Sequence, residues 1–191
     1  MQILNLSSII SPISDRDLEK LSRDNPDRRL ETDAYGKLII MSPTGSETSD
    51  RNSELIFQVK LWNKSSKLGK VFDSSVGFRL SNGAVRSPYV SWITIDKWNA
   101  LTKEQKRKFA PIAPDFVIEL KSPSDDLQTL QQKMFEYMSC GVRLGWLIDS
   151  DTRQVEVYRH CQEKEVLKNP ANLSGENIMP GLNIDLIEIW G

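Results

Sequence analysis

Cysteine and histidine are scarce in this sequence. Its 191 residues include two cysteines, Cys140 and Cys161, and one histidine, His160. The cysteines have no CxxC spacing, which suits reduced structural thiols better than a zinc site or a disulfide framework. A zinc site or a histidine nucleophile would need partners that the chain does not offer.

Long apolar runs are absent as well. No stretch approaches the length of a membrane span, and residues 1–15 lack the basic segment and small-residue cleavage site of a secretory leader. We therefore expect a cytoplasmic protein that does not enter a membrane. Positive charge is not in excess, since the formal net charge is −1. Dedicated nonspecific DNA-binding proteins are usually basic, so any DNA contact here depends on a local patch.

The chain does contain enough apolar material for one domain. Hydrophobic residues make up 39% of it and no linker divides it, so we predict a single domain over residues 1–191. Helical spacing and end signals predict helices over residues 15–23, 47–68, 96–109 and 125–140. Alternation and turn signals predict strands over residues 28–32, 37–41, 71–80, 84–94, 116–120, 143–149 and 154–159.

The topology follows from how these segments succeed one another. Asn82 and Gly83 predict a hairpin in which strands 71–80 and 84–94 pair antiparallel. The strand, helix and strand over residues 116–149 predict a right-handed parallel crossover. The expected fold class is α/β, with a mixed central sheet flanked by helices, and residues 182–190 close the core in a way that the sequence does not define.

Two charged residues interrupt the most apolar of these strands. In the segment APDFVIELKSPSDD, Glu119 and Lys121 share one face of the strand with Asp115, because side chains alternate across a strand. An unpaired buried charge is costly. Glu119 and Lys121 therefore pair with each other, reach solvent at the end of the strand, or bind a ligand.

Three long phrases in order carry a family resemblance: GFRLSNGAVRSPYVSWI, APDFVIELKSPSD and KMFEYMSCGVRLGWLID. Over residues 41–158 the chain resembles the Uma-type endonuclease family, within the PD-(D/E)XK superfamily of restriction-endonuclease-like fold. The resemblance implies hydrolysis of DNA phosphodiester bonds with Mg²⁺ or Mn²⁺. We expect a homodimer, because cutting both strands of a duplex suits two-fold symmetry. The site residues that it implies are Glu119 and Lys121 of the motif, Glu47 or Glu54 of the first long helix, and Lys133 and Tyr137 of the following helix.

One position departs from the family pattern. Where the family has Ser-Pro-Asp, this chain has Ser87, Pro88 and Tyr89, so a metal-binding aspartate is replaced by a phenol, which is a poor magnesium ligand. Asp115 and Asp73 are the candidates to replace it. Either would be a metal ligand together with Glu119. Four residues of extended strand span about 13 Å, so Asp115 and Glu119 share an ion only if the strand bends sharply.

Structural interpretations compete with these roles. Glu47 fits a capping box with Thr44, Glu54 fits a solvated surface, and Lys133 and Tyr137 fit an amphipathic helix whose polar tips are satisfied. Two functions remain open. The first is a metal-dependent DNA endonuclease. The second is a degenerate nuclease fold that binds nucleic acid or a protein without cutting.

Overall fold

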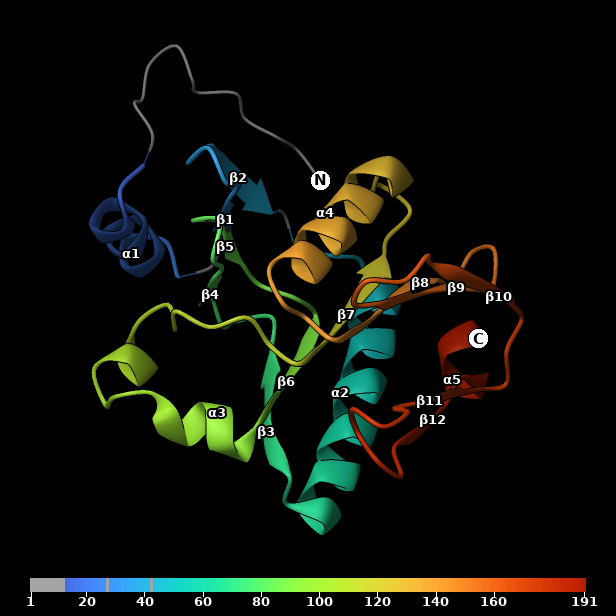
Figure 1. The fold of residues 1–191 in the computed structure, drawn as a ribbon. Helices are drawn as coiled ribbons and strands as arrows, with labels where there is room; N and C mark the ends of the chain where they lie inside the picture. The colour runs from blue at the N-terminus through green and yellow to red at the C-terminus, as the bar shows by residue number, and fades with distance from the viewer. Residues whose placement is uncertain (1–12, 27, 42) are drawn as a thin grey trace.

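A six-stranded mixed sheet forms the centre of the molecule (Figure 1). The computed structural model describes residues 13–26, 28–41 and 43–191. Strands β7 and β8 are parallel, and every other neighbouring pair in this sheet is antiparallel. In spatial order the strands are β10 (Glu165–Lys168), β9 (Gln154–Arg159), β8 (Leu144–Asp149), β7 (Phe116–Lys121), β6 (Val90–Thr94) and β3 (Gly69–Asp73).

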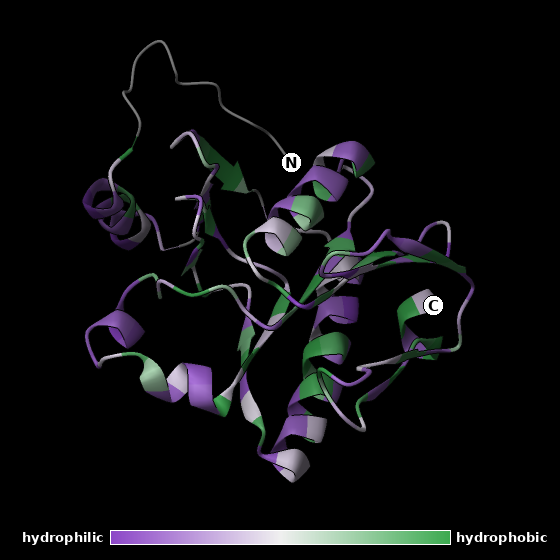
Figure 2. Cartoon of the chain, in the orientation of Figure 1, coloured by the Kyte–Doolittle hydropathy of each residue, from purple (hydrophilic) through white to green (hydrophobic). Residues whose placement is uncertain are grey.

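Helices cover both faces of this sheet. On β7, Phe116, Ile118 and Leu120 pack into the cluster that contains residues of α2 (Ser46–Ser66) and α5 (Ile187–Trp190). Val117 packs on the opposite face against α4 (Leu127–Ser139). The alternation along one strand thus joins two apolar layers, and the predicted α/β class with a mixed, helix-flanked sheet is confirmed (Figure 2).

A second, smaller sheet stands beside the central one and has the order β2-β1-β5-β4. Helix α1 packs on it through the buried side chain of Leu18, and Ser14 caps that helix as predicted. The remaining elements are β1 (Arg29–Thr32), β2 (Leu38–Met41), β4 (Phe78–Arg79), β5 (Val85–Arg86), β11 (Asn172–Ser174), β12 (Asn183–Asp185), α1 (Asp15–Asp24), α3 (Ile95–Ala100) and a 3₁₀ turn (Gln105–Arg107).

The predicted antiparallel pairing of residues 71–80 with residues 84–94 is confirmed, but it is divided between the two sheets. Each predicted strand is split, so that β3 pairs with β6 in the central sheet whereas β4 pairs with β5 in the small one. Pro88 has no N–H to donate to a ladder, and the Asp73 carboxylate closes a turn by accepting from the Ser75 N–H. The tip is as predicted, with Gly83 at a φ of 92°.

Several helix ends differ from the prediction. Residues 96–109 contain the short helix α3 and a 3₁₀ turn in place of one helix. Thr44 forms no capping box with Glu47, because Gly45 is the N-cap of α2 and no side chain caps it. The same helix ends at Ser66, and Lys67 rather than Gly69 adopts the left-handed conformation. One domain over residues 1–191 stays a prediction, since residues 1–12, 27 and 42 lie outside the described part.

The central strand β7 should dominate the stability of the fold. Ile118 has no exposed surface, whereas the side chain of Ile187 is 68% exposed. We predict that Ile118→Ala lowers the free energy of unfolding by about 2–5 kcal/mol through lost burial and the cavity left behind. Ile187→Ala, the matched control, should change it by less than about 0.5 kcal/mol. Equal effects in urea denaturation would contradict the placement of β7.

Candidate active site

Glu119 is a wholly buried carboxylate in the middle of the protein. Its place in β7 turns it toward α4, where it has no exposed surface. Its Oε1 atom accepts a hydrogen bond from the Tyr137 hydroxyl at 2.9 Å and lies 2.8 Å from Lys133 Nζ. Its Oε2 atom is buried and has no hydrogen-bond partner among the described residues. Burial raises the pKa of Glu119, and the charge of Lys133 opposes that rise.

Helix α4 supplies both of these partners from one face. Asp126 starts the helix by accepting a hydrogen bond from the Thr129 N–H, and Lys133 and Tyr137 follow one turn apart. Burial, reinforced by the Glu119 charge, raises the pKa of Tyr137 well above its ordinary value. The phenol therefore remains a hydrogen-bond donor to Glu119. The structure brings three of the predicted site residues together.

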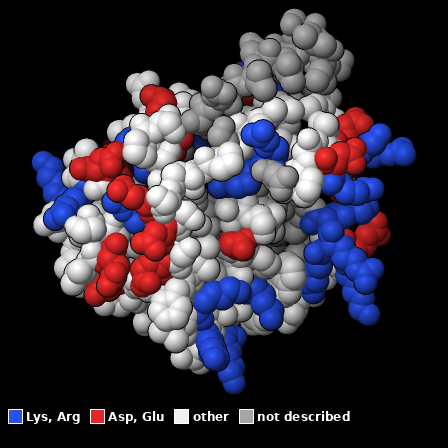
Figure 3. All heavy atoms as spheres, turned by 180° about the vertical axis from the view of Figure 1, so that it is seen from behind, with Lys and Arg blue, Asp and Glu red and all other residues white. Residues whose placement is uncertain are grey.

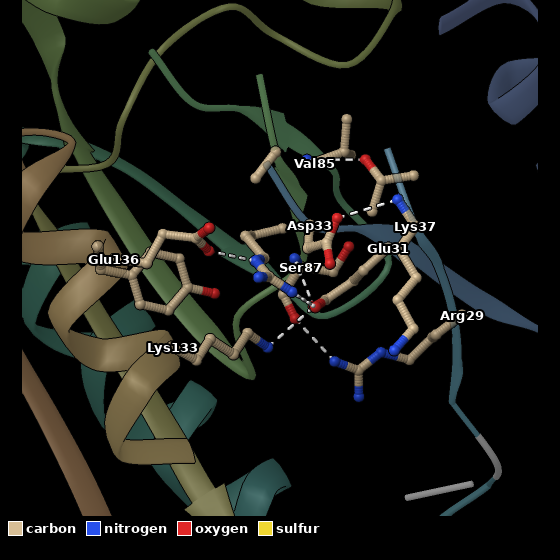
Figure 4. Close-up of polar contacts among 12 residues, drawn as sticks. Arg29, Glu31, Asp33, Lys37, Val85, Ser87, Lys133 and Glu136 are labelled. Carbon is tan, nitrogen blue, oxygen red and sulfur yellow. Dashed lines mark hydrogen bonds and ion pairs between the residues drawn. The ribbon is translucent and has the colours of Figure 1, made fainter. Parts of the chain in front are cut away.

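Glu31 belongs to the same cluster and was not among the predicted site residues. It lies on β1 with 1% exposure, and its Oε1 accepts from Lys133 Nζ at 2.9 Å and from the Ser87 N–H at 2.8 Å (Figure 4). Its Oε2 lies 3.2 Å from Arg86. Burial acts to raise the pKa of Glu31, but the charges of Lys133 and Arg86 outweigh it and the pKa is lowered.

Acidic and basic groups thus alternate through the interior. Lys133 bridges Glu119 and Glu31, and Arg86 bridges Glu31 and Glu136. The pKa of Arg86 is raised because the attraction of Glu31 and Glu136 exceeds the cost of burial. Since each buried cation has a carboxylate on either side, the network joins β1, β5, β7 and α4.

Tyr89, where the family resemblance implies an aspartate, borders this cluster. Its ring is 4% exposed, and the Arg29 guanidinium carbon lies 4.8 Å from the ring centroid. Arg29 also donates to the Ser87 carbonyl at 2.7 Å. Burial, together with the nearby Glu119 charge, raises the pKa of Tyr89 to about 12. At neutral pH this position therefore holds a neutral phenol rather than an anionic ligand.

Two cavities adjoin at Tyr89. The smaller, of about 200 Å³, is lined by Glu31, Arg86, Tyr89, Glu119 and Lys133 among others. The larger, of about 450 Å³, lies between the start of α2 and the turn over residues 122–125. Met41, Tyr89 and Asp125 line both of them. The larger cavity therefore shares a wall with the smaller one, which the buried Glu119 carboxylate lines.

Lys121 and the two helix glutamates lie elsewhere. Lys121 Nζ is 3.6 Å from Asp149 and 3.8 Å from Asp151, so it pairs across the strand ends and not with Glu119. Glu47 is exposed on the rim of the larger cavity, 3.8 Å from Arg51. Glu54 accepts from Gln58, whose side chain also contacts Asp185 of β12. The structure does not bring these residues to the Glu119 carboxylate.

The two candidate replacements for the missing aspartate also have other partners. Asp115 precedes β7 at its opposite end, where it accepts from the Thr94 N–H and pairs with Lys97 at 3.1 Å. Asp73 is exposed at the end of β3, where it accepts from Ser75. Neither carboxylate lines the cavity beside Glu119.

The cluster offers few ligands for a metal ion. Within residues 13–26, 28–41 and 43–191, no group of three or more His, Cys, Asp or Glu side chains is arranged to hold one. The unpartnered Glu119 Oε2 is a hard oxygen in a cavity wall, which suits one ligand of Mg²⁺ or Mn²⁺. Mg²⁺ often binds through one or two carboxylates, water and substrate phosphate. Glu119 could therefore supply one ligand of such an ion, and water and substrate phosphate would have to supply the others.

The buried charges make a prediction about stability. Glu31→Gln should lower the free energy of unfolding by about 3 kcal/mol, because it leaves Lys133 and Arg86 with less compensating charge. In the double variant with Lys133→Met the loss should be smaller than the sum of the single losses by about 1–3 kcal/mol. Because the pKa of Glu31 is lowered from 4.5, its contribution is complete above pH 4.5 and declines as the pH falls further.

Urea denaturation across pH 3–8 measures these effects. Glu47→Gln is the control, because that side chain is 82% exposed and should contribute less than about 0.5 kcal/mol. Strict additivity of the Glu31 and Lys133 variants would show that the two groups do not interact.

Comparisons with known proteins agree with this architecture. No curated protein matches the chain. It is similar to a crystal structure described as "a putative nuclease belonging to DUF820" from Anabaena variabilis, with 24% identity and a TM-score of 0.71 over 84% of this chain and 89% of that one. That likeness supports the fold. The family model described as "Uma2: Putative restriction endonuclease" matches residues 15–187. This match covers most of the sequence, and the chain belongs to the Uma2 family.

Proposed function

We propose that this protein is a nuclease that hydrolyses phosphodiester bonds of DNA, with its reaction centre in the cavity beside Glu119. The observation that carries the proposal is that the two oxygens of the Glu119 carboxylate have different surroundings. One oxygen is held by Lys133 and Tyr137, and the other is buried with no partner among the described residues. A fully buried acid kept in this condition costs stability, which is typical of a functional site. Membership of the Uma2 family supports the same reaction.

Mg²⁺ or Mn²⁺ is the cofactor that we propose, held by Glu119 Oε2. When bound, the ion would polarise the phosphate and lower the pKa of an attacking water. The protein's own groups prepare the site. Tyr137 and Lys133 fix the orientation of the carboxylate, and Arg86 and Glu31 hold Lys133 in place. We assign to Lys133 the charge-neutralising function that the motif gives to Lys121.

DNA is the substrate that we propose, because the modest overall charge conceals a basic region. Residues 67–108 contain nine Lys and Arg and three Asp and Glu, a formal charge of +6 in a chain of net charge −1, and all of these cations except Arg86 lie outside the buried network. Figure 3 shows basic and acidic side chains gathered on different parts of one face. Phosphate contacts favour such a region.

The proposal extends to assembly and location. Because a duplex has two-fold symmetry, a homodimer would present two sites to its two strands. Cys140 and Cys161 are both free, which agrees with the reducing cytoplasm where we place the protein. Among the described residues, no helix has the length and apolarity needed to cross a membrane.

The metal site is tested with Glu119→Gln, which preserves shape and removes the charge. Titration calorimetry with MgCl₂ and MnCl₂ should detect binding to the wild type that disappears in the variant, and cleavage of duplex DNA should be lost with it. Lys121→Ala is the control and should retain metal binding and cleavage within a few-fold, because Lys121 faces Asp149. Cleavage that survives Glu119→Gln would exclude this site. Loss of cleavage in Lys121→Ala would show that Lys121, and not Lys133, has the charge-neutralising function.

Two observations favour a second function, the binding of nucleic acid or protein without cleavage. Lys133 already compensates the Glu119 charge at 2.8 Å, and Tyr89 offers no anionic ligand. A site with one available carboxylate binds Mg²⁺ weakly, since fewer charged ligands lower the affinity. The two functions therefore differ in what a carboxylate at position 89 should do. It should restore metal binding only if the chain is a nuclease that lacks this one ligand.

Tyr89→Asp distinguishes them. The new carboxylate would lie near Glu119 and beneath Arg29, which can pair with it. If the chain is a nuclease weakened at this position, metal affinity should rise by about tenfold and cleavage should rise in parallel. Tyr35→Asp is the control, because Tyr35 is 87% exposed. A variant that folds but gains neither metal affinity nor cleavage would favour the binding function.

A further inference from the structure

Helix α2 carries an apolar stripe that faces solvent. Leu55 and Val59 are fully buried against the central sheet, but Phe57 is 57% exposed and Leu61 is 54% exposed. These two residues are one turn apart, so they form one continuous patch along the helix. Large exposed apolar side chains grouped in this way are typical of an interaction surface.

Charged residues flank this stripe with a regular order. Asp50 lies seven residues before Phe57, and Lys64 lies seven residues after it. Seven residues are close to two turns, so all three share one face of the helix. Both charged side chains are exposed and form no ion pair in the part of the chain that the structure describes. Acid and base are therefore placed symmetrically about Phe57.

Two further charged residues lie closer to the centre, one on each flank of the stripe. Glu54 lies three residues before Phe57 and Lys60 three residues after it. Lys60 forms no ion pair with the described residues. The Glu54 carboxylate accepts a hydrogen bond from the Gln58 side chain. The first half of the face is thus acidic and the second half basic. In Figure 3 basic side chains gather at the lower edge, where Figure 1 places the end of α2.

We infer that α2 packs antiparallel against α2 of a second copy of this chain, around a two-fold axis at Phe57. In an antiparallel pair centred there, each residue before Phe57 faces the residue equally far after it in the other copy. Asp50 then faces Lys64 of the second copy, and the two Phe57 side chains meet. Such a surface is self-complementary, as an isologous dimer requires. An unrelated partner would not require this symmetry of acid and base.

The arrangement deepens the proposed function, on which it rests, by naming the surface of the proposed homodimer. The start of α2 lines the larger cavity, next to the Glu119 site. Thr48 precedes Phe57 by nine residues, so the two cavities would lie about 27 Å apart along the helix direction, at 1.5 Å per residue. Two reaction centres would then serve one duplex.

The apolar centre is tested by sedimentation equilibrium of the purified full chain. The wild type should be a reversible dimer at micromolar concentrations, and Phe57→Ser should weaken association by at least about tenfold. Phe135→Ser is the matched control, because Phe135 is also on a helix and is 53% exposed. A monomeric wild type at 100 μM (roughly the weak limit for a specific dimer), or equal weakening by both variants, would overturn the inference.

The symmetry is tested by exchanging charges. Asp50→Lys places like charges opposite each other twice in the dimer, as does Lys64→Asp, so each should weaken association about tenfold. The double variant Asp50→Lys/Lys64→Asp restores both pairs and should associate within a few-fold of the wild type. Failure of the double variant to recover, while circular dichroism shows a folded protein, would exclude the antiparallel alignment. Cleavage by variants that remain monomeric is measured separately, so loss of the dimer and loss of nuclease activity are distinguishable.

Discussion

The Lys133 ammonium, held between two buried carboxylates, is the interaction on which the rest of this site depends. Its contacts with Glu31 and Glu119 join the small sheet, the central sheet and α4 at one point. Removing charges from water is expensive, and a buried ion pair returns little net stability compared with apolar side chains of the same size. The apolar layers on either side of β7 are ample for folding, so we interpret the network as serving the chemistry of the cavity.

Lys121 and Lys133 are both candidates for the charge-neutralising function beside Glu119. The sequence motif favours Lys121, because it follows Glu119 by two residues on the same strand face. The structure places an ammonium at 2.8 Å from Glu119, but it comes from Lys133 on α4, and Lys121 pairs with Asp149. A motif defines positions along a strand, whereas the charge at a carboxylate depends on whichever side chain reaches it. Glu119 and its helix partners therefore form a stronger hypothesis than the linear ExK pattern.

The elements closest to Glu119 could be predicted because their signals are local. β7 is an apolar run between turn residues, and α4 has a cap, an apolar face and a terminal glycine, so both were predicted to within two residues. Glu31 could not be identified, because an acid between Leu30 and Thr32 suits the outer face of a hairpin equally well. Its burial depends on Arg86 and Lys133, which lie 55 and 102 residues away in sequence. Long-range contacts of this kind leave no periodic signal.

Tyr89, at the position where the family resemblance implies an aspartate, affects the charge balance of this network. An aspartate there would add a third anion beside Glu31 and Glu119, which Lys133, Arg86 and Arg29 would have to balance together with any metal ion. Tyr89 removes that charge, and its ring packs beneath Arg29, which retains a partner in the Ser87 carbonyl. The phenol therefore leaves the cavity closer to electrical balance without a metal ion. In the metal-dependent reaction that we propose, Tyr89 would lower the metal affinity of the resting site, and substrate phosphate would supply the remaining ligands for Mg²⁺.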